Sequence, residues 1–151
     1  MTVREASAGD AEAVAALLTE LGYPTAPDVA AERLAALGDH DRVLLAGDGA
    51  GLIALHRIPR LAEGGAFTRI TALVVAPDHR GRGTARSLLE AAEDIARAWG
   101  CDLIEVSSGR RRERNRAHDI YAAAGFTDTT ATATRYHRPL PPGDRPRGAT
   151  K

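Results

Sequence analysis

A glycine-rich turn between an apolar run and a helical pattern carries the clearest chemical signal in the sequence. It reads Val74-Val75-Ala76-Pro77-Asp78-His79-Arg80-Gly81-Arg82-Gly83-Thr84-Ala85. Glycines let an anion approach the backbone, several N–H groups can point at one spot, and the N-terminus of the following helix adds partial positive charge. Because Arg80 and Arg82 add full charges, the turn predicts a site for phosphate groups.

Other interpretations of this turn are open from the residues alone. An isolated G-x-G pattern is more often an ordinary connection with solvated arginines. The Walker pattern needs a lysine followed by serine or threonine, which is absent here. The dinucleotide-binding fingerprint needs a third small residue, and that position holds Arg86. Both nucleotide patterns are therefore weak matches.

The remaining reactive residues give weaker signals. Histidines 40, 56, 79, 118 and 137 do not follow metal-ligand spacing, and Cys101 has no second thiol. We therefore expect no metal and no internal disulfide. His56 falls on a predicted strand that could border an acceptor cleft and act as a base, although a histidine there is more often simply satisfied or exposed. Arg110 to Arg112, with Arg114 and Arg116, form a basic cluster, and most such clusters are solvated.

Length and charge limit the classes of protein to consider. The 151 residues suit one domain, and the 20 lysines and arginines equal the 20 aspartates and glutamates. This balance disfavours long-range attraction to nucleic acid or to an anionic membrane. The chain has no signal-peptide pattern and no run of eighteen apolar residues, so a cytoplasmic protein is expected.

Periodic apolar spacing predicts the elements that position the turn. A helix over residues 83–99 has one apolar and one charged face, and a helix that starts near Ser7 and Asp10 should end at Leu21. We expect one domain over residues 1–138 and a disordered tail over residues 139–151. The further elements expected are strands over residues 2–5, 42–46, 52–58, 67–75, 103–106 and 130–138, and helices over 28–37 and 116–124.

Two motifs in this order resemble the GCN5-related N-acetyltransferase (GNAT) family. Arg80, Gly83 and Ala85 match its first signature, and a later series matches its second, namely Asn115, Ala117, Tyr121, Ala124, Gly125 and Phe126. The resemblance implies an α/β fold of the α+β type. In it, a mixed, mostly antiparallel twisted sheet of six to seven strands is flanked by about four helices and splays between the fourth and fifth strands.

The resemblance also implies a place for acetyl-coenzyme A in that splayed cleft. The pantetheine arm would pair with the backbone of Leu73, Val74 and Val75. Asn115 would contact the pantetheine or position its helix. The backbone amides of the turn would hold the pyrophosphate, which agrees with the anion site expected from the residues. These amides belong to Arg80, Gly81, Arg82, Gly83, Thr84 and Ala85.

Acetyl transfer to an amine requires an unprotonated amine, a donor to the oxyanion and a proton for the leaving thiolate. By resemblance, Tyr121 would supply the proton and a backbone N–H near Val75 would face the oxyanion. Many relatives carry a glutamate as base where this chain has Thr71 and Ala72. Glu105 is the substitute candidate for the base. A strand glutamate that simply faces solvent is an equally good interpretation of this residue. The amine could instead lose its proton to water.

The resulting hypothesis is an N-acetyltransferase that moves the acetyl group of acetyl-CoA to a primary amine of a small molecule or peptide. The alternative is a non-catalytic acyl-CoA sensor or interaction module with the same fold. A nucleic-acid protein is disfavoured. The region from Tyr23 to Arg33 would shape the acceptor side without naming the acceptor, and a homodimer is compatible with the resemblance.

Overall fold

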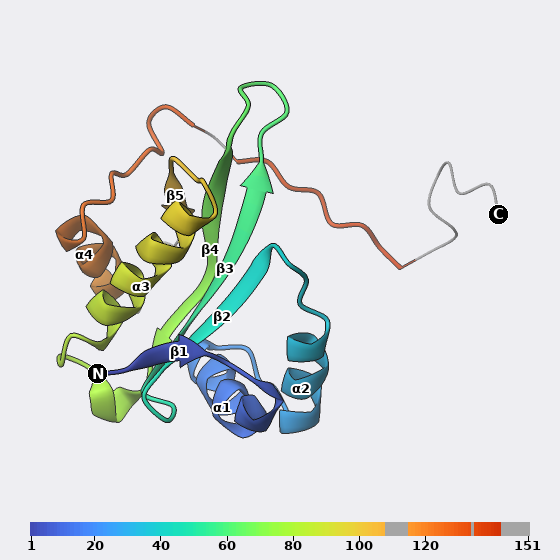
Figure 1. The fold of residues 1–151 in the computed structure, drawn as a ribbon, viewed down its shortest axis with the longest axis vertical. Coiled ribbons are helices and arrows are strands. Elements are labelled where there is room, and N and C mark those ends of the chain that lie inside the picture. Colours follow the sequence, from blue (N-terminus) through green and yellow to red (C-terminus); the bar gives the residue numbers. More distant parts are fainter. Residues whose placement is uncertain (108–114, 134, 143–151) are drawn as a thin grey trace.

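The computed structural model describes residues 1–107, 115–133 and 135–142. Its centre is a five-stranded sheet in the order β1-β2-β3-β4-β5 (Figure 1). All neighbouring strands are antiparallel except β4 and β5, which are parallel. The strands are β1 (Val3–Glu5), β2 (Asp41–Ala46), β3 (Gly51–Pro59), β4 (Ala66–Val75) and β5 (Ile104–Val106).

Helices cover both faces of this sheet (Figure 1). On one face, buried Val14, Leu17 and Ala30 pack against Leu45 and Leu52. On the other face, buried Leu88, Leu89 and Ala92 pack against strand residues that include Ile53 and Ile70. The helices are α1 (Ala11–Leu21) and α2 (Pro27–Ala35) on the first face, and α3 (Thr84–Ala98) and α4 (Asn115–Ala123) on the second.

The sheet opens along β4. The parallel pairing with β5 covers only Thr68 to Ile70, although β4 continues to Val75. The register of β3 against β4 also shifts, because Ala54 pairs with Ala72 while Leu55 pairs with Ile70. Thr71 is therefore an extra residue on β4, which is the arrangement of a β-bulge. The expected splay between the fourth and fifth strands is confirmed.

Most expected elements are confirmed within a few residues of their predicted ends, but the closing strand over residues 130–138 is wrong. The described residues of that range contain turns and irregular chain. Local acceptors take the N–H groups that a sheet would need: Thr130 N–H donates to the Asp128 carboxylate at 2.9 Å, and Ala133 N–H donates to the Thr129 carbonyl at 2.9 Å. The described chain thus has five strands instead of six to seven.

No described helix combines the length and the apolar character needed to cross a bilayer. Four α-helices are present in the described chain, as expected, together with short 3-10 turns at Ala8–Asp10 and Pro77–His79. The domain boundary at residue 138 stays a prediction.

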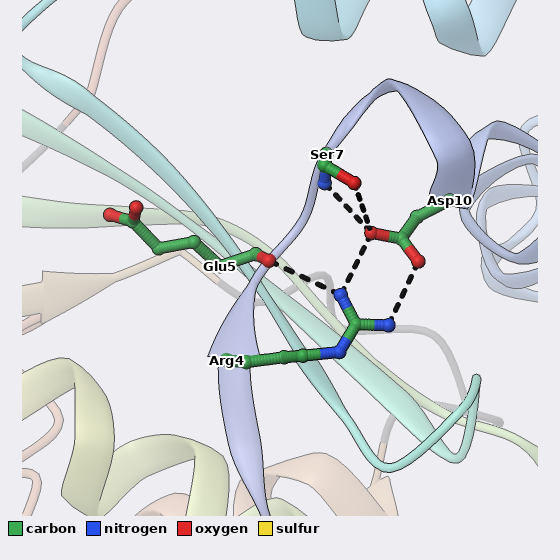
Figure 2. A network of polar contacts seen from close by, with 4 residues as sticks. All are labelled: Arg4, Glu5, Ser7 and Asp10. Carbon is green, nitrogen blue, oxygen red and sulfur yellow. Dashed lines mark hydrogen bonds and ion pairs between the residues drawn. The ribbon is translucent and has the colours of Figure 1, made fainter.

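A polar network fixes the first strand to the first helix (Figure 2). Two nitrogens of the Arg4 guanidinium donate to the two carboxylate oxygens of Asp10, each at 2.8 Å. The Ser7 N–H donates to the same carboxylate at 2.7 Å, as expected for the capping pattern. The hydrogen bond from Arg4, with that from Ser7, holds the pKa of Asp10 well below its usual range.

Replacing Asp10 by asparagine is expected to lower the melting temperature at pH 7. A carboxyl with a depressed folded pKa stabilises the fold above its unfolded pKa of about 4, and this contribution is lost as the pH falls through the folded pKa. The difference between the wild type and Asp10→Asn should therefore shrink below about pH 4. Thermal unfolding of both proteins at pH 7, 4 and 3 measures this difference in melting temperature.

Asp94→Asn is a suitable control for this effect, because Asp94 lies on the exposed side of α3 with only a 3.8 Å ion pair to Arg97. Its melting temperature should follow that of the wild type at every pH. Equal stability of Asp10→Asn and wild type at pH 7 would contradict the role assigned to this network.

Candidate active site

An open cleft of about 420 Å³ lies where β4 and β5 separate. The C-terminal end of α1 closes one side of it, and α4 contributes Tyr121. The cleft-lining residues are Leu21, Gly22, Tyr23, Ile70, Thr71, Ala72, Leu73, Val106, Ser107 and Tyr121.

The edge of β4 beside this cleft offers backbone groups that no described strand pairs. Ala76 N–H donates to the Ala50 carbonyl at 2.8 Å, so the backbone groups of Ala76 face β3. Going back along β4, successive residues direct their N–H and C=O groups alternately away from β3 and toward it. By this alternation Val74 faces β3, while Leu73 and Val75 direct their backbone groups to the side from which β5 has departed. Two of the three predicted pantetheine residues therefore have backbone groups suited to an added strand.

The glycine turn follows directly on this edge. Gly81 and Gly83 have φ values of 74° and 78°, a left-handed conformation that disfavours other residues. A Cβ placed on either glycine would meet nothing within 4 Å, so space is open beside both. Gly83 caps the N-terminus of α3, whose first N–H groups have no partner inside the helix. The turn thus fits an anion such as a pyrophosphate.

The side chains around the turn have separate roles. Thr84 is buried, and its hydroxyl donates to the His79 carbonyl at 3.4 Å, so only its backbone is available to a ligand. Arg82 is exposed. The Arg80 guanidinium is paired with Glu20 at the end of α1, at 3.1 Å. A phosphate held by Arg80 would therefore share this guanidinium with Glu20 or displace the carboxylate.

Tyr121 lies in the cleft, as its predicted role requires. Its ring packs edge to face against Phe126, with centroids 5.7 Å apart and planes at 61°. The Phe126 N–H donates to the Tyr121 carbonyl at 3.0 Å, which fixes the end of α4. The predicted Asn115 begins α4, but its side chain lies outside the described part of the structure, as do Arg110 to Arg112 and Arg114.

Glu105 does not line the cleft. Its neighbours Ile104 and Val106 pack toward α3, so the alternation of β5 places Glu105 on the opposite face. There the Arg69 guanidinium donates to its carboxylate at 2.7 Å. Glu105 thus faces Arg69 instead of the cleft, and its role as the base stays a prediction.

A second hollow of about 400 Å³ adjoins the first one. The two share residues at the end of α1 and at the β4 bulge, including Tyr23 and Thr71. The second hollow extends toward α2, where Arg33 contributes to its wall. Tyr23 and Arg33 thus line this hollow, and the acceptor side expected at residues 23–33 stays a prediction. The bulge at Thr71 was not predicted, because a one-residue shift of register leaves no mark in the composition of the strand.

The pairing of four polar residues in one row was also missed, although two of them, His56 and Glu105, were named as candidate bases. Asp41, His56, Arg69 and Glu105 are neighbours in register across β2, β3, β4 and β5. The sequence shows that each of these strands carries polar residues. Which of them face each other depends on the register between strands, which the sequence does not show. Arg69 and Asp41 therefore gave no signal of their own.

Comparison with known proteins supports this description. The family model for the acetyltransferase (GNAT) family matches residues 12–126. An aminoalkylphosphonate N-acetyltransferase of Salmonella typhimurium strain LT2 is 33% identical over 130 residues, which are 82% of this chain and 83% of that protein.

Solved structures show the same fold. A GNAT family acetyltransferase of Staphylococcus aureus gives a TM-score of 0.74 at 22% identity, over 92% of this chain and 98% of that one. A ribosomal-protein-alanine N-acetyltransferase of Brucella melitensis also gives 0.74 at 22%, over 93% of this chain and 100% of that one. The family match and the curated relative together show that this chain belongs to the acetyltransferase (GNAT) family.

Proposed function

We propose that this acetyltransferase uses acetyl-CoA to acetylate the primary amine of a small molecule. The observation that carries the proposal is the continuous path from the open edge of β4, at Leu73 and Val75, to the glycine turn before α3. The strand edge suits the amides of a pantetheine arm, and the turn suits its pyrophosphate. The co-substrate supplies an acetyl group activated as a thioester.

The residues of the cleft suit the steps of such a transfer. The amine nitrogen forms a bond to the acetyl carbon, and the carbon–sulfur bond breaks. A free N–H at Leu73 or Val75 donates to the oxygen that becomes negative during attack. The Tyr121 hydroxyl donates a proton to the departing sulfur. The amine proton must go to a base or to water.

The second hollow is where we place the acceptor. Arg33 is the only charged residue among the described residues that line either hollow, and no described carboxylate pairs with it. A guanidinium of this kind binds carboxylates and phosphates through paired hydrogen bonds. We therefore propose an acceptor that carries an acidic group besides its amine, as the aminoalkylphosphonates of the relative do.

Turnover experiments test the function. Acetyl-CoA is mixed with the protein and with 2-aminoethylphosphonate, β-alanine, ethanolamine or putrescine, and the release of free thiol is followed. We expect thiol release with the acidic amines. Calorimetric binding of acetyl-CoA without turnover of any amine would instead favour the sensor, and absence of binding would refute the proposed function.

Replacing Arg33 by glutamine is expected to lower kcat/KM for 2-aminoethylphosphonate by about 10- to 100-fold, the value of a hydrogen bond to a charged group. The value for ethanolamine, which has no acidic group, should not change. Arg86→Gln serves as the control, because Arg86 lies on the exposed side of α3 and pairs with Glu90. An equal loss for both amines would contradict acid recognition by Arg33.

A further inference from the structure

His56 has no role in the site described so far, although its contacts are those of a catalytic base. His56 lies on β3, and its Nδ1 is 2.6 Å from the Asp41 carboxylate on β2. The Gly38 N–H donates to the other oxygen of that carboxylate at 3.1 Å. Asp41 is therefore held from behind while it orients the imidazole. This is the arrangement of a base and its orienting group.

The tautomer that this contact favours leaves the other ring nitrogen available. An ionised Asp41 accepts a hydrogen bond from Nδ1–H, so Nε2 carries the lone pair. The hydrogen bond from Gly38 lowers the pKa of Asp41, as does the contact with His56, while burial opposes them. Within the described chain, Nε2 has no hydrogen bond, and 46% of the side chain is exposed.

His56 lies on the acceptor side of the sheet. Ala54 and Ala72 pack on the face covered by α1 and α2, and the alternation of β3 places His56 on that face too. Ala54 contacts the β4 bulge, since its carbonyl accepts from the Thr71 hydroxyl at 3.4 Å. His56 is two residues further along β3, which is about 7 Å. His56 is not among the residues that line either hollow, so water would bridge its imidazole to an acceptor bound there.

We propose that His56 Nε2 accepts the proton of the acceptor ammonium through water, and that Asp41 is its positioning residue. The inference rests on the proposed function. In this step the ammonium N–H bond breaks, the proton binds Nε2, and the freed nitrogen lone pair attacks the acetyl carbon. The second N–H proton, lost as the amide forms, restores the Tyr121 hydroxyl that protonated the sulfur, and the imidazolium returns the first proton to solvent.

The charges around His56 are compatible with this role. Asp41 faces it from β2, and His40 precedes Asp41 in the chain. Arg69 is its neighbour on β4, but Glu105 on β5 pairs with that guanidinium. Arg135 lies 4.0 Å from the same Glu105 carboxylate, so this group keeps a net positive charge, but within the described chain only Asp41 makes a polar contact with the imidazole. The same ion pair explains why Glu105 is the weaker candidate.

The pH dependence of kcat/KM tests the proposal, measured with 2-aminoethylphosphonate and saturating acetyl-CoA. If neutral His56 receives the proton, the wild-type value should level off at a pH well below the pKa of the amine. In His56→Gln only free amine can react, so the value should rise with unit slope up to the pKa of the amine. The loss should be about 100-fold at pH 7 and shrink at pH 9.

Two further variants complete the experiment. Asp41→Asn loses the carboxylate that orients the imidazole, so its kcat/KM at pH 7 should fall and its profile should approach the unit slope of His56→Gln. His40→Gln, one residue from Asp41, should keep the wild-type profile. A constant ratio between wild type and His56→Gln from pH 6 to 9 would overturn the inference and leave the proposed function standing. No turnover by the wild type with any amine would overturn both.

Discussion

Tyr121→Phe is expected to lower kcat by at least about 100-fold while the affinity for acetyl-CoA changes little. The substitution removes the hydroxyl that would donate a proton to the departing sulfur. It keeps the ring, and with it the edge-to-face packing on Phe126. Steady-state kinetics with the best acceptor and calorimetric titration of acetyl-CoA separate the two effects. The loss should appear in kcat because proton donation acts in the transition state.

Tyr136→Phe provides the matched control, because Tyr136 is 89% exposed and lies outside the cleft. This variant should retain wild-type rates. Unchanged kcat in Tyr121→Phe would exclude the tyrosine as proton donor. A parallel fall in kcat, acetyl-CoA affinity and melting temperature would show a structural role for Tyr121 instead.

The parts of the structure that local patterns determine could be predicted from the sequence. The helix over Thr84–Ala98 has one apolar face, and Leu88 and Leu89 on that face are buried as expected. Gly83 lies at the start of that helix with positive φ, as a strand-to-helix turn for an anion requires. Such features depend on neighbours within a few residues, which the sequence itself displays.

Features that depend on which strand residues face each other could not be predicted. Glu105 was recognised as a carboxylate on a strand, but its partner Arg69 is 36 residues away. The pairing of Asp41 with His56 depends in the same way on the β2–β3 register. The strand expected at residues 130–138 failed for another reason. Its threonines and alanines provide little apolar area, so local hydrogen bonds to Asp128 and Thr129 prevailed.

Gly83→Glu is expected to weaken acetyl-CoA binding at least about 100-fold. Backbone hydrogen bonds to a charged phosphate contribute about 1.5–3 kcal/mol each, so the loss of two accounts for such a change. The new carboxylate would lie at the mouth of the anion site and repel the pyrophosphate. It would also occupy the open space beside the glycine. Calorimetric titration of acetyl-CoA measures the loss.

Gly64→Glu distinguishes this effect from backbone strain. Gly64, in the turn between β3 and β4, has a φ of 76° against 78° for Gly83, and an added Cβ meets nothing within 4 Å at either position. Both substitutions impose a similar conformational cost, so both should lower the melting temperature by similar amounts. Only Gly83→Glu should lose the ligand. If the two variants bind acetyl-CoA equally well, the pyrophosphate does not lie at this turn. A carboxylate added at Gly83 would repel a pyrophosphate bound there and weaken its binding.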